Sequence, residues 1–459
     1  MMHSQAIECK NGRHESACHF SADPPQAAQS SAPSEYSLQF LYLLFHSGMI
    51  QYFLKGGGGP LRQFFSEFRN FFRRGDMVLL FLCVGTSAFG CLMIASATNY
   101  MGYTRNVAVQ IFAILAGILM YAIVSSIDIR SLTERRTWLV LFNSALLLML
   151  LTPYGQTLNG NRSWLQFPFL PFKVQPAEFC KISYVIIMAS VMAKYQDRVS
   201  SPRAVIHMVF HLAMAAGLNW LISGDAGVSL IFVFIFIVAA FAGGVKLIWF
   251  LLGGGLIAAA VPFIWQYGMQ DYQRRRILVL IDPSIDPLGF DERYHIVRSL
   301  RSLNGGGLTG QGLFNGHRTQ NGALAAQHTD FIFSAIGEEM GYLGCVLVIV
   351  MLLLIIIRCI YVGVRSPDYM RKLVCFGAAG ALIFQTISNV GMCMGVTPVI
   401  GLTLPFISYG GSSILSMFMM MGLVSGVHAR PTRPIHERYI SSPLGMQVRK
   451  EKKKRNTQK

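Results

Sequence analysis

Charged residues are scarce in this chain. Asp, Glu, Lys and Arg make up 13% of the 459 residues, whereas 53% are hydrophobic and the mean hydropathy is +0.45. A water-soluble globular domain carries about twice that share of charge, so the composition excludes one. The net charge of +17 does not indicate nucleic acid as a partner. The Lys and Arg residues lie between and beyond the apolar runs rather than among exposed aromatics, which is typical of residues that set membrane topology.

Cysteine motifs are also missing, and we expect no cleavable signal at the N-terminus. The 9 cysteines form no CxxC pair, and most lie in or beside apolar runs. We interpret them as small core residues rather than disulfide or metal ligands. The first 34 residues are polar and include Glu8, Glu15 and Asp23, which does not fit a cleavable signal peptide.

Long apolar runs are what the chain has instead. A membrane helix needs about 20 mostly apolar residues, and about ten such runs predict an all-α polytopic membrane protein with a large extracytoplasmic loop between spans 7 and 8. We place the membrane domain at 77–428. The predicted spans are 77–97, 107–127, 136–152, 178–195, 204–222, 227–243, 246–266, 332–360, 373–396 and 405–428.

The flanking regions differ from this domain. Residues 1–58 form an N-terminal extension that we predict to be partly disordered, and its apolar run at 37–54 fits an extra span or an interfacial segment equally well. Residues 59–76 place Phe on one helical face and Arg on the other, which predicts a helix lying in the headgroup layer. Residues 429–459 form a basic tail. The positive-inside rule places this tail, the N-terminus and the short basic connections in the cytoplasm.

Two connections predicted to lie outside the cell are long enough to carry function: 153–177 and 267–331. The second is rich in arginine, which suits phosphate oxygens, although a long loop also tolerates charge. Its arginines are Arg274, Arg275, Arg276, Arg293, Arg298, Arg301 and Arg318. A glycine run at 305–316 follows, which fits either an anion-binding nest or a flexible turn.

Acidic residues follow the glycine run, around the start of the next span. Thr329 or Asp330 could cap that helix, or Asp330 could act as a base toward a sugar hydroxyl. Glu338 and Glu339 follow two helical turns further on, where an ionisable group is a candidate functional residue or the partner of a buried Arg or Lys.

Two further segments carry polar or helix-breaking residues. Glu178 and Lys181 begin another span at a spacing that fits a local ion pair. Pro398, Pro405 and Gly410 mark a bend at membrane depth, which is expected to line a cavity.

Four segments together resemble the shape, elongation, division and sporulation (SEDS) family of bacterial peptidoglycan polymerases. They are NGNRSW through QPAEFCKI, RRRILVLIDPSIDPLG with the glycine run, QHTDFIFSAIGEEMG, and NVGMCMGVTPVIGLTLPFISYGGSS. The similarity extends from about Phe71 to Val427. It implies a ten-span enzyme of the cytoplasmic membrane that polymerises lipid II, the undecaprenyl-pyrophosphate-linked disaccharide peptide. It also implies a class B penicillin-binding protein and other elongation or division proteins as partners.

The resemblance identifies Asp330, in the HTDF motif, as the catalytic residue of an inverting glycosyl transfer. Residues of the matching motifs are expected to bind substrate: Trp164, Glu178, Lys181, Arg318, Gln320, His328, Thr329, Glu338, Ser408 and Gly410. Lys181, Arg318 and the cluster 274–276 are candidates for receiving the leaving diphosphate. Mg²⁺ or Mn²⁺ could share that role, but no ligand set in the sequence predicts a metal site.

The chain departs from the family pattern at Ala325 and Ala326, where Pro and Glu are usual, and at Arg298, where Gln is usual. His295 is similar to elongation-type members, although division or sporulation stays open. Two other functions compete with polymerisation. Many spans with acidic residues also suit a lipid II transporter (flippase), and the loss of the Glu suits a non-catalytic scaffold for a transpeptidase.

Overall fold

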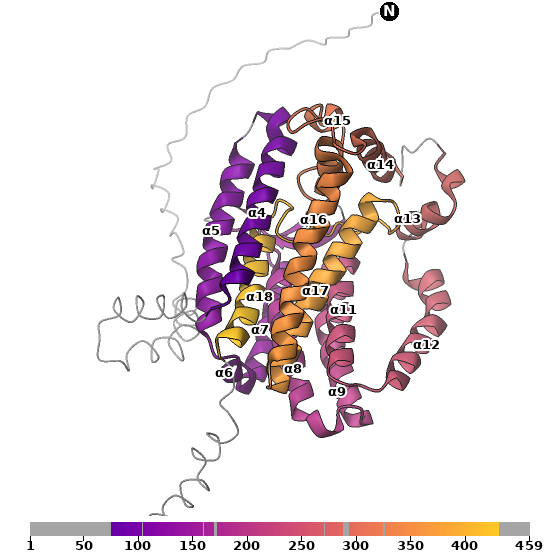
Figure 1. The fold of residues 1–459 in the computed structure, drawn as a ribbon. Coiled ribbons are helices and arrows are strands. Elements are labelled where there is room, and N and C mark those ends of the chain that lie inside the picture. The colour runs from indigo at the N-terminus through magenta and orange to yellow at the C-terminus, as the bar shows by residue number, and fades with distance from the viewer. Residues whose placement is uncertain are drawn as a thin grey trace, which may run out of the picture. The chain divides into compact units, whose positions relative to one another are not determined.

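The structure, a computed structural model, describes residues 75–430 except 103, 159, 169–171, 270, 288–292 and 325. The predictions for 1–58, for the interfacial helix up to residue 74 and for the tail from 431 fall outside the described residues. Helices dominate the described chain, and their numbering follows Figure 1.

Eight helical segments of the described chain are long and apolar enough to cross a membrane, and two shorter apolar segments, Arg136–Leu151 and Ala226–Ala242, match the remaining predicted spans. The prediction of an all-α, polytopic membrane protein is therefore confirmed. The helices are α4 (Met77–Thr98), α5 (Arg105–Ser126), α7 (Arg136–Leu148), α8 (Pro176–Lys194), α9 (Pro202–Leu212), α10 (Leu218–Ser223), α11 (Ala226–Ala242), α12 (Leu247–Phe263), α16 (Ile332–Arg365), α17 (Tyr369–Cys393) and α18 (Gly411–Ala429). A π-helical turn, Ala213–Gly217, joins α9 to α10.

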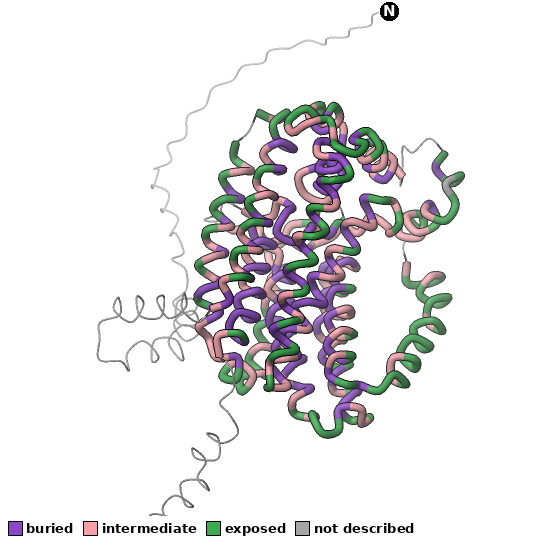
Figure 2. Tube along the Cα trace, in the orientation of Figure 1, coloured by how far each residue is buried: buried purple, intermediate pink, exposed green. Residues whose placement is uncertain are grey.

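The helices α8 and α18 form the centre of the bundle, where most of their residues are buried (Figure 2). Small residues let α18 approach α5 closely. A Cβ atom at Gly422 would lie 2.8 Å from the carbonyl oxygen of Tyr121, and one at Gly117 would lie 2.6 Å from the ring of Phe418. Such close backbone approach is the usual way in which membrane helices associate.

The helix α12 stands apart from this core. None of its residues is buried, and Figures 1 and 2 show it as an exposed helix at the edge of the bundle. Near its first turn, the Trp249 indole N–H donates a 2.9 Å hydrogen bond to the carbonyl oxygen of Ser200.

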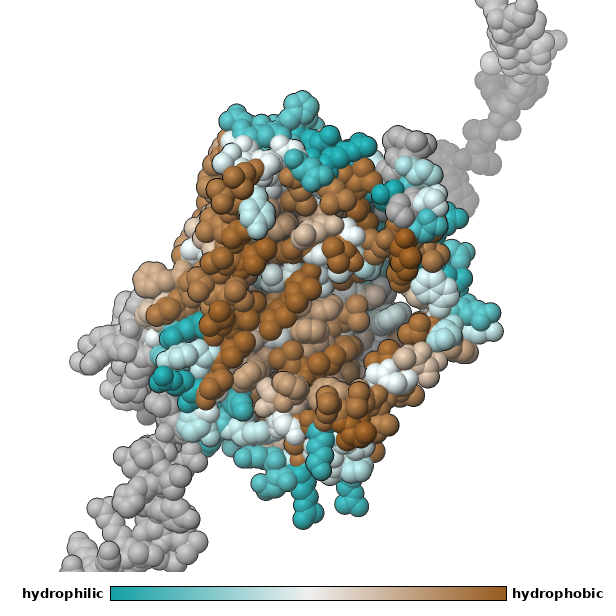
Figure 3. Space-filling model, turned by 45° about the vertical axis from the view of Figure 1, so that its right-hand side comes forward, coloured by the Kyte–Doolittle hydropathy of each residue, from teal (hydrophilic) through white to brown (hydrophobic). Residues whose placement is uncertain are grey.

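The surface matches a membrane environment. On the face that Figure 3 displays, apolar side chains cover the middle of the bundle, and hydrophilic ones gather toward its two ends. With the ten apolar helical segments, this distribution makes the chain a multi-pass membrane protein.

One end of the bundle carries the long connections between helices, and we call it the loop face. The region 153–177 contains a two-stranded antiparallel sheet, β1 (Gly155–Leu158) and β2 (Asn161–Leu165), where only a loop was expected. The region 267–331 is mostly helical rather than open loop. Its helices are α13 (Asp271–Ile281), α14 (Tyr294–Gly306) and α15 (His317–Gln320).

The helix α16 is broken at Gly341, where φ is +68° and ψ is −163°. In an unbroken helix, Gly337 and Cys345 would be about 12 Å apart along the axis. A Cβ atom at Gly337 would instead lie 3.1 Å from the Cys345 sulfur, so the segment 332–340 folds back on the longer part of α16. Glu338 and Glu339 therefore precede the long membrane-crossing part rather than lying two turns deep within it, as the sequence suggested.

Candidate active site

The HTDF segment lies at the loop face, where α17 holds its backbone. The Asn389 side-chain amide donates a 2.8 Å hydrogen bond to the carbonyl oxygen of Asp330. Phe331, not Thr329 or Asp330, is the N-terminal flanking residue of α16, and no side chain caps that helix. The helix-cap alternative is therefore wrong, and the Asp330 carboxyl is not used to begin α16.

The segment before α18 supports the same motif from its other side. The Ser408 hydroxyl donates a 2.6 Å hydrogen bond to the carbonyl oxygen of Thr329, and the Tyr409 N–H donates one of 2.9 Å to that of His328. The rings of His328 and Tyr409 lie 5.6 Å apart. Ser408 and His328, both predicted as site residues, thus belong to one backbone framework around Asp330.

Gln110, a buried residue of α5, was missed by the sequence analysis. Its side-chain N–H donates to the carbonyl oxygen of Ser408, and its side-chain oxygen accepts from the N–H of Gly410, both at 3.3 Å. This pair of bonds fixes the bend before α18. In the sequence, a lone Gln within an apolar run indicates such a residue, because a buried side-chain amide must find hydrogen-bond partners.

The electrostatic setting of Asp330 suits proton transfer. Burial first, and the negative charge of Asp225 second, raise the pKa of its carboxyl to about 6, although a hydrogen bond with Thr329 acts in the opposite direction. Burial also lowers the pKa of His328. A carboxyl that titrates near neutrality can take up and release a proton under ordinary conditions.

Asp225 is the second carboxylate of this region, and the sequence analysis did not select it. It precedes α11, where its side chain accepts a 3.1 Å bond from the N–H of Val228 and a 3.4 Å bond from the Ser163 hydroxyl. Burial raises the pKa of Asp225, hydrogen bonds oppose that change, and the negative charge of Glu178 adds to it. In the sequence, the position of Asp225 between two apolar runs indicates a candidate site residue.

Glu178 and Lys181 form the local ion pair that their spacing allowed. The Lys181 ammonium lies 2.9 Å from a Glu178 carboxylate oxygen, and the Lys181 side chain has no exposed surface. The Ser416 hydroxyl donates a 2.6 Å bond to the other carboxylate oxygen. The pair therefore joins α8 to α18 next to the site, with its charges already matched.

Glu338 binds protein rather than an open site. Its carboxylate accepts hydrogen bonds from the N–H of Arg318 at 2.7 Å, from the N–H of Thr319 at 3.1 Å and from the Thr319 hydroxyl at 2.8 Å. No Arg or Lys side chain pairs with Glu338 or Glu339 among the described residues, so the prediction of a buried cationic partner is wrong. Backbone amides and neutral side chains supply the hydrogen bonds instead.

Gln320 and Glu339 secure the neighbouring turn. The Gln320 side-chain N–H donates a 2.8 Å bond to Glu339, and the Ser96 hydroxyl donates one of 2.5 Å to the same carboxylate. The Asn99 side chain donates to Gln320 at 3.0 Å. Gln320 thus fastens α15 to the end of α4.

Close packing explains much of the glycine run. A Cβ atom at Gly306 would lie 1.8 Å from the carbonyl oxygen of Gly337, and one at Gly310 would lie 2.1 Å from that of Glu339. The backbone of this loop therefore lies directly on the segment 332–340, where no side chain fits. Neither an anion-binding nest nor a flexible turn is needed to account for these glycines.

Trp164 lies on β2 next to the site's second carboxylate. Ser163 and Leu165 are buried, whereas Trp164 is partly exposed and faces the opposite side of the strand. The indole is thus on the face of β2 that does not contact Asp225.

Several arginines of the region 267–331 make contacts within the protein. The guanidinium of Arg276 donates to the carbonyl oxygen of Val399 at 3.4 Å, and Arg274 pairs with Asp271 at 3.3 Å. Arg298 donates to the carbonyl oxygen of Ala323 and stacks over Tyr294. The N–H of Arg318 is held by Glu338, and its side chain is half-buried at the loop face.

A divalent cation finds no ligand set here. Within the ranges that the structure describes, no three His, Cys, Asp or Glu side chains come together as a metal site. Position 326, where the family resemblance implies a carboxylate, is Ala.

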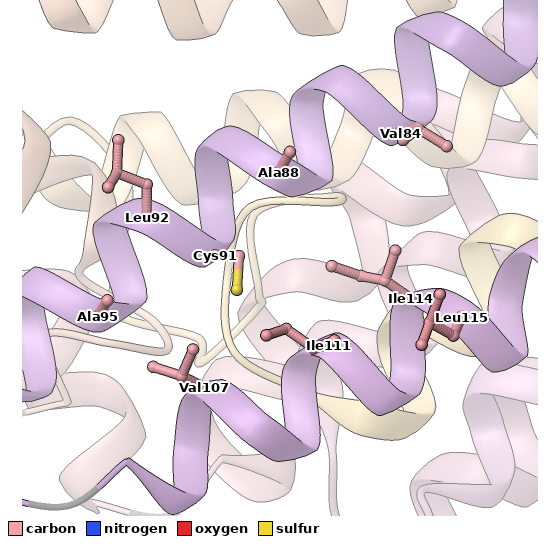
Figure 4. Close-up of a pocket in the computed structure, with 9 residues that line it drawn as sticks. All are labelled: Val84, Ala88, Cys91, Leu92, Ala95, Val107, Ile111, Ile114 and Leu115. Carbon is pink, nitrogen blue, oxygen red and sulfur yellow. The ribbon is translucent and has the colours of Figure 1, made fainter.

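A groove between α4 and α5 is lined by apolar side chains (Figure 4). Its walls include Val84, Leu92 and Ile111, and Cys91 is its one thiol. Such a lining offers no acid, base or charge for chemistry.

The fold and the site together define a polytopic membrane protein with an acidic motif at its loop face, and comparison with known proteins identifies the family. The model of the cell cycle protein family that comprises FtsW, RodA and SpoVE matches residues 77–433. The chain belongs to this family, as the resemblance predicted.

Named relatives cover most of the chain. The probable peptidoglycan glycosyltransferase FtsW of Geobacter metallireducens is 32% identical over 368 residues, which are 78% of this chain and 95% of the relative. The peptidoglycan glycosyltransferase MrdB of Escherichia coli is 28% identical over 358 residues, which are 77% of this chain and 93% of the relative.

Solved structures agree with these matches. A chain from a study of the structural coordination of polymerization and crosslinking by a peptidoglycan synthase complex has a TM-score of 0.65 and 29% identity, over 78% of this chain and 99% of its own. The rod shape determining protein RodA of Thermus thermophilus has a TM-score of 0.58 and 26% identity, over 78% of this chain and 98% of its own.

Proposed function

We propose that this chain is a peptidoglycan glycosyltransferase that polymerises lipid II, with Asp330 as the general base. The observation that carries the proposal is the Asp330 carboxyl. It lies at the loop face, it caps no helix, and its pKa is raised to about 6. Relatives named as peptidoglycan glycosyltransferases support the same activity.

The chemistry follows from that carboxylate. The 4-hydroxyl of one lipid-linked GlcNAc attacks the anomeric carbon of a MurNAc and transfers its proton to Asp330. The anomeric C–O bond breaks with its electron pair leaving on undecaprenyl diphosphate, so the anomeric configuration inverts. General-base catalysis is most effective when the base has a pKa near the working pH. Much of the base is then ionised, and it still binds the transferred proton strongly.

Positive charge supports the orientation in the bacterial cytoplasmic membrane. The face opposite the loop face carries Arg130, paired with Asp368, and Arg371, 3.5 Å from Asp128. Basic connections favour the cytoplasm, so the loop face, with Asp330, is the outer one and both termini are cytoplasmic. Lipid II would be polymerised outside the cell.

A class B penicillin-binding protein is the proposed partner, together with other elongation or division proteins. Support comes from the relative that was solved within a peptidoglycan synthase complex in which polymerization and crosslinking are coordinated.

The test uses purified protein in liposomes with labelled lipid II. Wild type should form glycan polymer, Asp330→Asn should form none, and Asp271→Asn should behave as wild type because its side chain is 90% exposed. Lipid movement without polymer would instead assign a transporter. Polymer formed equally by Asp330→Asn would contradict the proposed base, and complementation of a deletion by that variant would assign a scaffold.

A further inference from the structure

Asp225 is fixed in place by three contacts. Its carboxylate accepts bonds from the N–H of Val228 and the hydroxyl of Ser163, and the Asn219 side chain donates a 3.2 Å bond to its carbonyl oxygen. These partners come from α11, β2 and α10. A charge held by three elements keeps its distance from neighbouring groups and needs no rearrangement to act on them.

Asp330 and Gly227, which follows Asp225 by two positions, lie against the same short segment, 400–402. A Cβ atom at Gly401 would lie 3.6 Å from an Asp330 carboxylate oxygen. On the other side, a Cβ atom at Gly227 would lie 2.9 Å from the carbonyl oxygen of Ile400 and 3.4 Å from an Asp225 carboxylate oxygen. Both carboxylates therefore lie in the same part of the site and interact electrostatically, although 105 positions separate them along the chain.

No cation neutralises this pair at close range. Among the described residues, neither carboxylate has a Lys or Arg within the ion-pair distance. The charged and titratable groups on the surrounding elements are Glu178 and Lys181 of α8, Arg276 of α13, Cys393 of α17, Tyr409 before α18 and His328 of the HTDF segment. Lys181 is bound to Glu178, and Arg276 reaches a backbone carbonyl oxygen, so the negative charge of Asp225 is not compensated by either.

We propose that Asp225 is a positioning residue of the reaction, whose fixed negative charge makes the Asp330 carboxylate a stronger base. The inference rests on the proposed function and adds a second acid to it. A neighbouring negative charge disfavours the ionised form of Asp330, so that form binds the hydroxyl proton more readily. The raised pKa of Asp330, with burial as the first cause and Asp225 as the second, agrees with the geometry.

The helix-cap role of Asp225 can be separated from its charge. Asn is as favoured as Asp before a helix, so Asp225→Asn keeps the start of α11 and removes the charge. Asp225→Glu keeps the charge on a longer side chain that caps less well. Asp368→Asn is the matched control, because Asp368 precedes α17 in the same way at the opposite face.

The measurement is the initial rate of lipid II polymerisation between pH 5 and 8. In wild type the initial rate should fall on the acidic side of its pH profile, and we call this fall the acidic limb. For Asp225→Asn, we expect the acidic limb to move to lower pH by about half to one pH unit. We also expect the maximal rate at higher pH to fall. Asp225→Glu should keep the limb of wild type, as should Asp368→Asn. A folded Asp225→Asn protein with an unmoved limb overturns the inference and leaves Asp225 as a helix cap.

Failure of the proposed function looks different. If Asp330→Asn polymerises lipid II, the proposed base is wrong, whatever Asp225 does. If Asp330→Asn is inactive and the limb of Asp225→Asn is unmoved, only the role of Asp225 is wrong. Should Asp225→Asn fail to fold, Asp225→Ser, which also caps helices, replaces it, and the same shift or its absence decides.

Discussion

Replacing Asp330 by Asn is expected to stabilise the folded protein while abolishing its activity. The folded state holds the pKa of Asp330 at about 6, against an ordinary value of 3.8. One pKa unit corresponds to about 1.4 kcal/mol, so keeping this carboxyl ionised costs the folded state at most about 3 kcal/mol. Asn has the same shape and no charge, so the variant avoids that cost.

The stability difference between Asp330→Asn and wild type should depend on pH. A carboxyl whose pKa is higher in the folded state binds its proton more tightly there, so the folded state loses stability as pH rises. The loss begins near pH 4, where the unfolded chain ionises, and is complete above about pH 6. The advantage of Asp330→Asn should therefore be near zero at pH 4 and fully present at pH 7.5.

Thermal melting in detergent, with a thiol-reactive dye, measures the effect without any substrate. At pH 7.5 the apparent melting temperature of Asp330→Asn should exceed that of wild type by roughly 3–6 °C, and the gap should close toward pH 4. The scan rate must be the same for both, because membrane proteins often unfold irreversibly. Asp271→Asn should show no gain. An Asp330→Asn variant that melts at or below wild type at pH 7.5 would refute the electrostatic argument.

Three further predictions follow from the same structure. The wild-type polymerisation rate should fall about tenfold for each pH unit below about 6 as Asp330 is protonated, and a flat profile from pH 5 to 8 would contradict its role. Gly310→Ala should destabilise the protein by about 1–3 kcal/mol in melting experiments, because its Cβ would lie 2.1 Å from a backbone oxygen, whereas Gly254→Ala, with open space, should be neutral. Arg358→Met should cost about 3–5 kcal/mol by leaving the buried Asp76 carboxylate unpaired. Adding Asp76→Asn should restore part of that loss, and no recovery in the double variant would argue against the ion pair as the cause.

The spans could be predicted because the bilayer sets their length. Apolar runs long enough to cross it appear directly in the sequence, and each of the ten predicted ranges corresponds to an apolar helical segment. Asp330 could be predicted for a different reason, because its HTDF motif resembles that of a known family. The ion pair of Glu178 with Lys181 was also predictable, because residues three apart share a helical face.

The roles of Glu338 and Asp225 were not predictable in this way. An acidic residue beside a span fits a ligand site, a buried ion pair or a cap equally well until its partners are known. For Glu338 the partners lie in α15, and for Asp225 they include the Ser163 hydroxyl of strand β2 and the Asn219 side chain of α10. Both sets of partners depend on how distant segments pack.

Which segments cross the membrane, and which acid carries the family's motif, can be read from the sequence alone, because both follow from local composition and order. The reversal at Gly341, the packing of the glycine run against the reversed segment, and the electrostatic interaction of Asp225 with Asp330 all depend on how the chain packs in three dimensions. The physical reason is that helix packing brings together residues about 100 positions apart, and no local pattern encodes which charges will then face each other.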